Sequence, residues 1–488
     1  MRSEPAQAGG PRADPLAGRR ILVGISGSIA AVKLPLLVSA LARRGADVRC
    51  LLTPSAARLV SAEALACLSR HRCYLDADQW SHLAARPLHV ELAEWAELVL
   101  VAPLSATSLG RWVHGLGDSL LASTLLACEA PVLAAAAMNT AMWASPAVRA
   151  NWQRLQTWPG VLTLGPAAGV LACDRHGDGR MAEPELLLLA LESLALWGCG
   201  RDWQGRRLLV SAGPTREFLD PARCLTNPSS GRMGVLLAQA ARLRGAAVEL
   251  VHGPLALPPA WLEGLDCREA TTAAAMQVAL LEAQPRADAI AMAAAIADHR
   301  RAAPLAHKLS KQALEQQLGG GWETVPDLLA GLVAARPAGQ AILGFAAHSG
   351  EVLPQAQAKW QRKGCDLLFA NPIDRPGTGF GADANEGWLL GPGERLTTLA
   401  RQPKLAIAHQ LLTALLGALG EGLRRPGGDP AAAGSAGDHR QPPLRQQGPG
   451  PGPLHCPDQP VPGIQPDRYP PDRYPLDRYP LDRAAADP

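Results

Sequence analysis

Two loops of small residues in this chain of 488 residues have the composition of phosphate-binding loops. Residues 24–28 (GISGS) end an apolar run, and residues 226–231 (TNPSSG) precede a helical run that begins near Arg232. Small residues let backbone amides approach a phosphate, and the N-terminus of the following helix adds a favourable field. We therefore expect an anion at each loop, with Gly27, Ser28 and Asn227 among its contacts.

The first loop differs from a dinucleotide site. Its spacing is not GxGxxG, and the next strand-like run ends at Thr53, where a dinucleotide site would carry an acidic residue for the ribose. Both features argue against NAD and are compatible with a mononucleotide such as FMN.

Lysine is scarce and unevenly placed. Of the 47 basic residues only six are lysines, and four of them fall within residues 308–363: Lys308, Lys311, Lys359 and Lys363. Lysine is a compact point charge where arginine is a flat fork, so a site that needs lysine resists replacement. The cluster indicates a functional site. Arg216 and Arg223 are suited to clamp a carboxylate or a phosphate.

Apolar strand-like runs alternate with helical runs from residue 19 to about 425. The expected strands are 21–28, 46–53, 96–103, 131–138 and 161–166, then 206–215, 246–254, 287–298, 341–349 and 365–372. Such alternation indicates parallel sheets covered on both faces. The predicted fold class is α/β, with two doubly wound Rossmann-like domains whose sheets are mostly parallel. We expect a disordered N-terminus (1–18), two domains (19–199 and 200–425) and a disordered, proline-rich tail (426–488) with three DRYP repeats.

Composition argues against several classes of protein. A hydrophobic fraction of 48% suffices for sizeable cores, and a net charge of +3 without a basic block does not indicate nucleic-acid binding. The first 18 residues lack an apolar signal segment, and Glu129 and Pro131 interrupt the most apolar stretch, 119–138. We therefore expect a cytoplasmic protein without a membrane span, whose cysteines are reduced.

Longer motifs add a family resemblance to the first half. The segments GISGSIAAVK (24–33), LHVELAEWAELVLVAPLSA (88–106), AAAMNTAMW (135–143) and ACDRHGDGRMAEP (172–184) resemble those of a flavoprotein family of coenzyme A synthesis. In that family a phosphopantothenoylcysteine decarboxylase is fused to a phosphopantothenate–cysteine ligase. The resemblance implies FMN contacts at Gly27, Ser28, Thr53 and Ser105.

The second half resembles the ligase of the same family through the segments AGPTREFLDPARCLTNPSSGRMG (212–234), AAAIADHR (293–300), KLSK (308–311) and GFAAHS (344–349). The resemblance implies that CTP is surrounded by Met292, Ala293, Ala294, Asp298, Lys308, Val325, Pro326, Asp327, Leu328, Phe345, Lys359 and Lys363. The chain departs from the family pattern at Val32, Ala136, Val325 and His348, where the family has an aromatic residue, proline, asparagine and glutamate.

The resemblance implies a ligase reaction with small-molecule substrates. CTP activates the carboxylate of 4'-phosphopantothenate as an acyl-cytidylate, and the cysteine amine then displaces CMP. Lys308 stabilises the activated group, and Asn227 and Arg223 hold the intermediate. Asp298 positions CTP or a Mg²⁺ bound to its phosphates; other metal ligands are not indicated.

The resemblance also implies how the decarboxylase works. FMN oxidises the substrate thiol to a thioaldehyde, which serves as the electron sink for loss of CO₂. His89 is the base or polarising group, Cys173 the proton donor on a flap and Asn139 the ligand of the substrate carboxylate. A homo-oligomer is implied, because the family's flavin sites lie at subunit contacts.

Two further interpretations stay open in the sequence. One is a flavin-dependent cysteine decarboxylase fused to an impaired ligase domain. The other is a non-catalytic flavoprotein regulatory subunit, against which His89 and Cys173 argue. An NAD dehydrogenase is disfavoured by the first loop.

Overall fold

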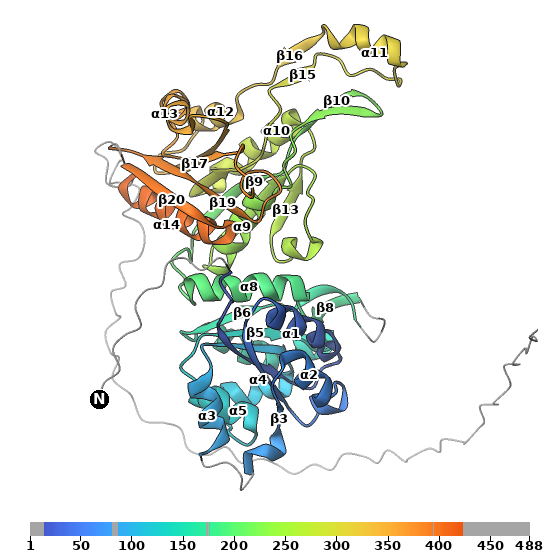
Figure 1. Cartoon of the computed structure of the whole chain (residues 1–488), viewed down its shortest axis with the longest axis vertical. Coiled ribbons are helices and arrows are strands. Elements are labelled where there is room, and N and C mark those ends of the chain that lie inside the picture. The colour runs from blue at the N-terminus through green and yellow to red at the C-terminus, as the bar shows by residue number, and fades with distance from the viewer. Residues whose placement is uncertain (1–13, 81–85, 172–173, 175, 394, 423–488) are drawn as a thin grey trace, which may run out of the picture. The chain divides into compact units, whose positions relative to one another are not determined.

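The computed structural model describes residues 14–80, 86–171, 174, 176–393 and 395–422, which are organised around two large sheets (Figure 1). Parallel strands make up the first sheet, in the order β3 (Cys73–Leu75), β2 (Asp47–Leu52), β1 (Arg20–Ile25), β4 (Leu98–Leu104), β5 (Val132–Ala136) and β6 (Val161–Leu164). The strand order reverses between β1 and β4, so a crevice is expected beyond their carboxyl ends.

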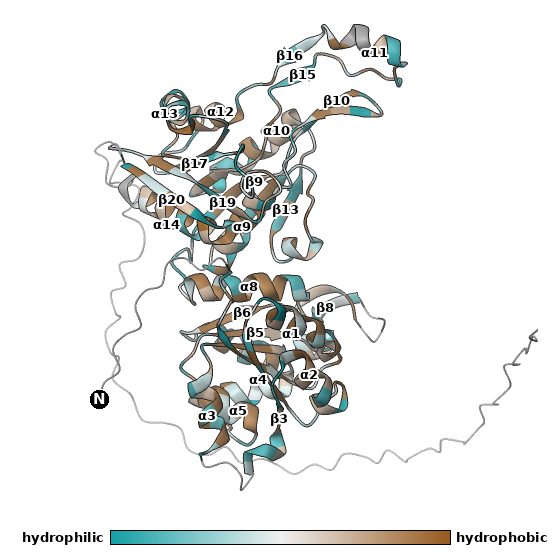
Figure 2. Ribbon diagram, viewed as in Figure 1, coloured by the Kyte–Doolittle hydropathy of each residue, from teal (hydrophilic) through white to brown (hydrophobic). Residues whose placement is uncertain are grey.

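Helices cover both faces of this sheet. One face packs against α1 (Leu34–Arg43), α2 (Ala62–Ser69) and α8 (Pro184–Trp197), and the other against α3 (Leu88–Trp95), α4 (Ala106–Val113), α5 (Leu120–Ala127) and α7 (Pro146–Gln156). Side chains of β1 alternate between the two cores, because neighbouring residues of a strand point to opposite faces. Figure 2 shows the apolar colour on the strands and along α8.

The second sheet is parallel over most of its width. Its order is β13 (Asp266–Glu269), β12 (Ala247–His252), β9 (Arg207–Ala212), β14 (Ala289–Met292), β17 (Ala341–His348), β18 (Leu367–Pro372), β19 (Ala384–Gly391) and β20 (Arg395–Pro403). The pairings of β19 with β18 and with β20 are antiparallel. The faces are covered by α9 (Arg232–Leu243) and α14 (Lys404–Gly422), and by α10 (Ala273–Ala283), α12 (Leu328–Ala334) and α13 (Val352–Lys363). The predicted α/β class with two mostly parallel sheets is confirmed.

Three hairpins lie outside the sheets, and the hydrophobic pattern predicts none of them. They are β7 (Ala167–Val170) with β8 (His176–Arg180), β10 (Arg216–Asp220) with β11 (Arg223–Thr226), and β15 (His299–Arg301) with β16 (Trp322–Thr324). Figure 1 shows β15 and β16, with α11 (Lys311–Leu318) in the segment between them, extending away from the second sheet beside β10. These strands lack apolar alternation because neither of their faces is buried in a large core.

The strand expected at 287–298 is much shorter than predicted. It ends at Met292, and residues 293–298 turn across the carboxyl edge of the sheet, where the amide of Ala295 donates to Gly213 O at 2.9 Å and the amide of Thr215 donates to Ala295 O at 3.1 Å. A continuous apolar run therefore contains both a buried strand and a small-residue loop. Among the described residues, no helix has the length and hydropathy needed to cross a bilayer.

Candidate active sites

Loops following β1, β2 and β4 meet at the crevice of the first sheet. The buried hydroxyl of Ser26 donates to Pro103 O at 2.7 Å and accepts from the amide of Ser105 at 2.8 Å. A Cβ on Gly27 would lie 2.4 Å from Cβ of Ser55, so the loops after β1 and β2 touch at a position that admits only glycine. The three predicted FMN loops are thus brought together.

Hydroxyl groups line these loops and suit a phosphate. Ser28 stands in extended conformation before the short helix η1 (Ile29–Lys33), and its side chain makes no capping hydrogen bond. Ser105 caps α4 by accepting from the amide of Ser108, and Thr53 accepts from the amide of Ala56. Backbone amides at a helix start, close loop contact and a free hydroxyl are the features that an FMN phosphate requires. The residues present therefore fit the cofactor.

The hairpin β7–β8 packs against the predicted substrate motif. The amide of Met138 donates to Gly179 O at 2.9 Å, and a Cβ on Gly179, whose φ is +149°, would lie 2.2 Å from Met138 O. Asn139 is the N-cap of α6 (Thr140–Ala144), with its side chain accepting from the amide of Ala141 at 2.8 Å. Cys173, which falls between β7 and β8 in the sequence, lies outside the described residues.

His89 is the second residue of α3, as expected for a loop–helix junction. Its ring is half-buried, and Nδ1 is buried without a hydrogen-bond partner. The structure places α3 beside α5. An unpartnered buried nitrogen costs free energy unless a ligand or another subunit satisfies it.

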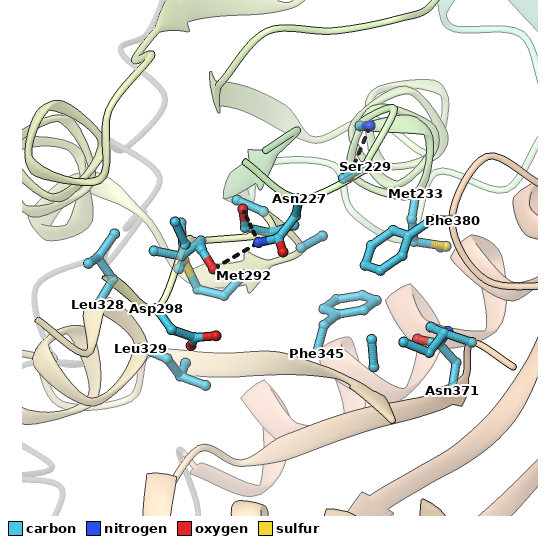
Figure 3. Close-up of a pocket in the computed structure, with 18 of the residues that line it drawn as sticks. Asn227, Ser229, Met233, Met292, Asp298, Leu328, Leu329, Phe345, Asn371 and Phe380 are labelled. Atoms are coloured by element: carbon cyan, nitrogen blue, oxygen red, sulfur yellow. Dashed lines mark hydrogen bonds between the residues drawn. The ribbon is translucent and has the colours of Figure 1, made fainter. Parts of the chain in front are cut away.

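A cavity of about 590 Å³ lies at the carboxyl edge of the second sheet, lined by loops that follow β14, β17 and β18 and by the start of α9. Figure 3 shows Asp298 on one side of it and the rings of Phe345 and Phe380 on the other. Most residues expected around CTP line it: Met292, Ala293, Ala294, Asp298, Val325, Pro326, Asp327, Leu328, Phe345, Lys359 and Lys363. Asn227 joins them.

Asn227 fixes the floor of the cavity. Its amide nitrogen donates to Ala295 O at 3.3 Å and to Ile296 O at 3.1 Å, as the dashed lines of Figure 3 indicate. The loop before α9 and the loop after β14 are thereby held together, with Gly231, at φ +79°, turning the chain into the helix. Residues 293–297, four alanines and one isoleucine, form this floor.

Two of the predicted lysines stand together on α13. Lys359 Nζ donates to Phe345 O at 3.2 Å, and Lys363 forms an ion pair with Asp327, which also caps α12. Burial lowers the pKa of Lys359, and the charge of Lys363 adds to this effect. Burial works against the Asp327 carboxylate, but the hydrogen bonds from Lys363 and the Ala330 amide hold its pKa below the usual value.

Arg223 and Lys308 are not among the lining residues. Arg223 bonds Asp220 at 2.8 Å and Leu309 O at 3.2 Å, and Lys308 is an exposed residue of the loop that this contact anchors. Asp220 is buried, which disfavours its charge, yet hydrogen bonds from the Ala222 and Leu309 amides and from Arg223 lower its pKa. The chain thus separates Lys308 from Lys359 and Lys363.

Several cavity residues have no counterpart among the predicted site residues. They are Ser229, Ser230, Arg232, Asn371, Phe380, Asn385 and Lys404. Lys404 is one of only six lysines, so its rarity was the available signal. Lys33, another of the six, pairs with Glu183 at 2.6 Å, which gives it a structural role. Among the described residues no cluster of three or more acidic, histidine or cysteine side chains is arranged to hold a metal.

Known proteins match both halves of the chain. Residues 11–195 match the family model Flavoprotein, and residues 203–418 match the C-terminal domain of DNA/pantothenate metabolism flavoprotein. A solved FMN binding protein, AtHal3, is 33% identical, with a TM-score of 0.32, over 36% of this chain and 94% of that chain.

The match with full-length relatives covers almost the whole of each relative's sequence. The coenzyme A biosynthesis bifunctional protein CoaBC of Bacillus subtilis is 36% identical over 403 residues, 81% of this chain and 96% of that protein. That of Mycobacterium bovis is 38% identical over 424 residues, 82% of this chain and 96% of that protein. The chain therefore belongs to the bifunctional coenzyme A biosynthesis family, in which a phosphopantothenoylcysteine decarboxylase and a phosphopantothenate–cysteine ligase share one polypeptide.

Proposed function

We propose that the cavity of the second sheet binds CTP and 4'-phosphopantothenate and joins the latter to cysteine. The observation that carries the proposal is the convergence of Phe345, Lys359 and Lys363 with the start of α9 in one cavity. An aromatic face suits a base, and the lysines and helix amides suit phosphates. Asp298 and Asp327 add carboxylates that are able to hold a Mg²⁺ arriving with the nucleotide.

The chemistry proceeds in two displacements. A carboxylate oxygen of phosphopantothenate attacks the α-phosphorus of CTP, and the bond to the β-phosphate oxygen breaks, so pyrophosphate leaves with the electron pair. The cysteine amine then attacks the acyl carbon, loses a proton to solvent, and CMP leaves. Cations placed where negative charge develops accelerate both steps. Asn227 orders the floor on which the intermediate lies. Lys308 stabilises the activated group from the loop outside the cavity, and Arg223 of β11 anchors that loop through Leu309 O.

The first sheet forms the decarboxylase site in this proposal. FMN, held by Gly27, Ser28, Thr53 and Ser105, supplies reversible oxidation of the substrate thiol. Asn139 orients the substrate carboxylate, and Cys173 is the proton donor. His89 holds or moves a proton through its ring. The domain limits 19–199 and 200–425 belong to the proposal as well.

A homo-oligomer is part of the proposal. Ile29, Val32 and Leu36, beside the flavin loop, are 55%, 53% and 76% exposed. An apolar patch of this kind indicates a contact with another protein surface. We infer that a second copy of the chain covers this patch.

Purification tests both halves. We expect a yellow protein with an FMN spectrum that makes phosphopantothenoylcysteine from CTP, cysteine and phosphopantothenate, and then releases CO₂. Lys308→Gln should abolish ligation and leave decarboxylation of added phosphopantothenoylcysteine intact. Decarboxylation without any ligation by the wild-type chain would instead support the impaired-ligase alternative.

A further inference from the structure

Lys404 is a buried cation that the proposed chemistry does not use. Its side chain is 4% exposed although it lines the cavity, and Nζ donates to Gly379 O at 2.7 Å. An ammonium group has three donors, so one carbonyl does not satisfy it. Among the described residues no carboxylate lies within ion-pair distance of this lysine. A buried charge without a counter-ion is costly.

The surroundings of Lys404 increase this cost. It is the first residue of α14, and a cation at a helix N-terminus opposes the helix dipole. Arg232, the first residue of α9, lines the same cavity, and its charge acts on Lys404. Burial, and secondarily Arg232, lowers the pKa of Lys404 to about 8. Two helix N-termini, each with a cation at its first residue, thus face one hollow.

Arg232 also lacks full compensation. Its guanidinium pairs with Asp383, whose side chain is 91% exposed, and Nε is buried without a hydrogen-bond partner. Asp383 O accepts from the amide of Lys404, so the pair and the helix start are joined. The cavity lining holds four cations, Arg232, Lys359, Lys363 and Lys404, against the two carboxylates of Asp298 and Asp327. The charge toward the cavity is therefore positive.

We propose that Lys404 and Arg232 form a phosphoryl-binding subsite, in which the missing counter-ion of Lys404 is a phosphate group of the substrates. The inference rests on the proposed ligase function. A phosphate reaching Lys404 also meets Ser229, Ser230 and the first amides of α9, which line the same part of the cavity. The phosphates of the nucleotide and the phosphate of phosphopantothenate share this chemistry.

Binding to the full-length protein tests the subsite. Calorimetry is run with pyrophosphate, CMP and 4'-phosphopantothenate on the wild type, Lys404→Gln, Lys404→Arg and the exposed-site control Arg154→Gln. We expect Lys404→Gln to weaken pyrophosphate binding at least tenfold, since bonds to charged groups contribute about 1.5–3 kcal/mol. Lys404→Arg should bind pyrophosphate more tightly than Lys404→Gln, Arg154→Gln should bind it as wild type does, and the affinity for CMP should not change in any variant.

The probes separate the two sources. A loss confined to 4'-phosphopantothenate supports the subsite and assigns it to that substrate. The proposal is overturned if wild type and Lys404→Gln bind pyrophosphate and 4'-phosphopantothenate with equal affinities. It is also overturned if the wild-type chain binds neither of these two compounds. If the chain shows no CTP-dependent ligation but its pyrophosphate binding depends on Lys404, the ligase proposal is wrong and the subsite is retained. Decarboxylation and thermal melting of each variant establish that it is folded.

The pH dependence of pyrophosphate affinity distinguishes a charged role of Lys404 from a role in packing. Because the Lys404 charge is lost as pH rises through about 8, wild-type affinity for pyrophosphate should fall between pH 7 and 9.5 relative to Lys404→Arg. The charged groups beside Lys404 are Arg232 and its ion-pair partner Asp383, and the cavity also holds Asp298, Asp327, Lys359 and Lys363. Parallel pH profiles for the two proteins would contradict the assignment.

Discussion

The hydroxyl oxygen of Ser26 lies 2.8 Å from the amide nitrogen of Ser105, a residue 79 positions later in the chain. The same hydroxyl donates to Pro103 O, so one buried side chain satisfies a donor and an acceptor of the β4 loop. The geometry of the flavin crevice is therefore set by a residue that need not touch the cofactor.

Ser26→Ala should destabilise the protein and weaken FMN retention together. The substitution leaves the Pro103 carbonyl and the Ser105 amide without their partner, which costs about 1–3 kcal/mol. Urea unfolding and the flavin-to-protein ratio after gel filtration measure the two effects. Ser123→Ala, which removes an exposed hydrogen bond, should change stability by less than about 0.5 kcal/mol. Full FMN occupancy in Ser26→Ala would contradict the role assigned to this residue.

Gly27→Ala should lose FMN while leaving the ligase active. The added Cβ would stand 2.4 Å from Cβ of Ser55, so the loops after β1 and β2 must move apart. Flavin absorbance and separate assays of both reactions check the outcome. Gly417→Ala is a suitable control, because a Cβ on this helical glycine would meet no neighbour within 4 Å. Alanine there should raise the free energy of unfolding by about 0.5–1 kcal/mol. Equal flavin content in both variants would refute the steric prediction.

Lys363→Gln should lower kcat/KM for CTP by about 10- to 100-fold and spare decarboxylation. The variant removes a cation from the cavity and leaves Asp327 without its ion-pair partner. Steady-state ligation with varied CTP measures the effect. Arg154→Gln, which removes an exposed cation outside the cavity, is the control. An unchanged kcat/KM in Lys363→Gln would remove this lysine from the nucleotide site.

Acid should destabilise the protein through His409. Burial, together with Arg244, lowers the pKa of this ring to about 3, and its Nε2 lies 3.0 Å from Ser193 Oγ. The folded-state value is below the ordinary 6.5, so the unfolded chain binds the proton first. The contribution is complete above pH 6.5 and decreases as pH falls toward 3.

Urea unfolding at pH 6.5 and 4.5 measures this loss. Wild type should lose roughly 2–3 kcal/mol more than His409→Gln over the interval, at about 1.4 kcal/mol per pH unit. His114→Gln, which alters an exposed histidine, should behave like wild type. If wild type and His409→Gln lost stability in parallel, the buried ring would not be the acid-sensitive group.

Periodicity predicts the fold well where strands are buried on both faces. The runs that become β1, β4 and β17 are apolar throughout because each of these strands lies between helical layers. It fails at residues 293–298, since alanine suits a strand and a loop equally. The hairpin β10–β11 is missed for the opposite reason: Phe218 and Leu225 are 40% and 41% exposed, so no burial pattern marks them.

Some residues of the candidate sites could be predicted from the sequence and others could not. Asn227, Asp298 and Phe345 follow directly from motifs, and the structure brings them into one cavity. Lys404 and Asp220 escape prediction because a sequence does not reveal which charged side chains become buried. The Lys33–Glu183 pair joins residues 150 positions apart, which local spacing cannot indicate. The FMN contacts, the CTP contacts and the catalytic roles of His89 and Cys173 stay predictions.

The small-residue floor at residues 293–297 has a consequence for drug resistance. The amides of residues 293, 294, 295 and 297 already donate to other groups of the protein, so an inhibitor contacts this floor by packing against it. Exchange of one small side chain for another leaves those contacts in place, and a larger side chain would fill the hollow that the natural substrates need. Compounds anchored on the floor would therefore leave fewer escape routes by point mutation than compounds anchored on Lys359 or Phe380.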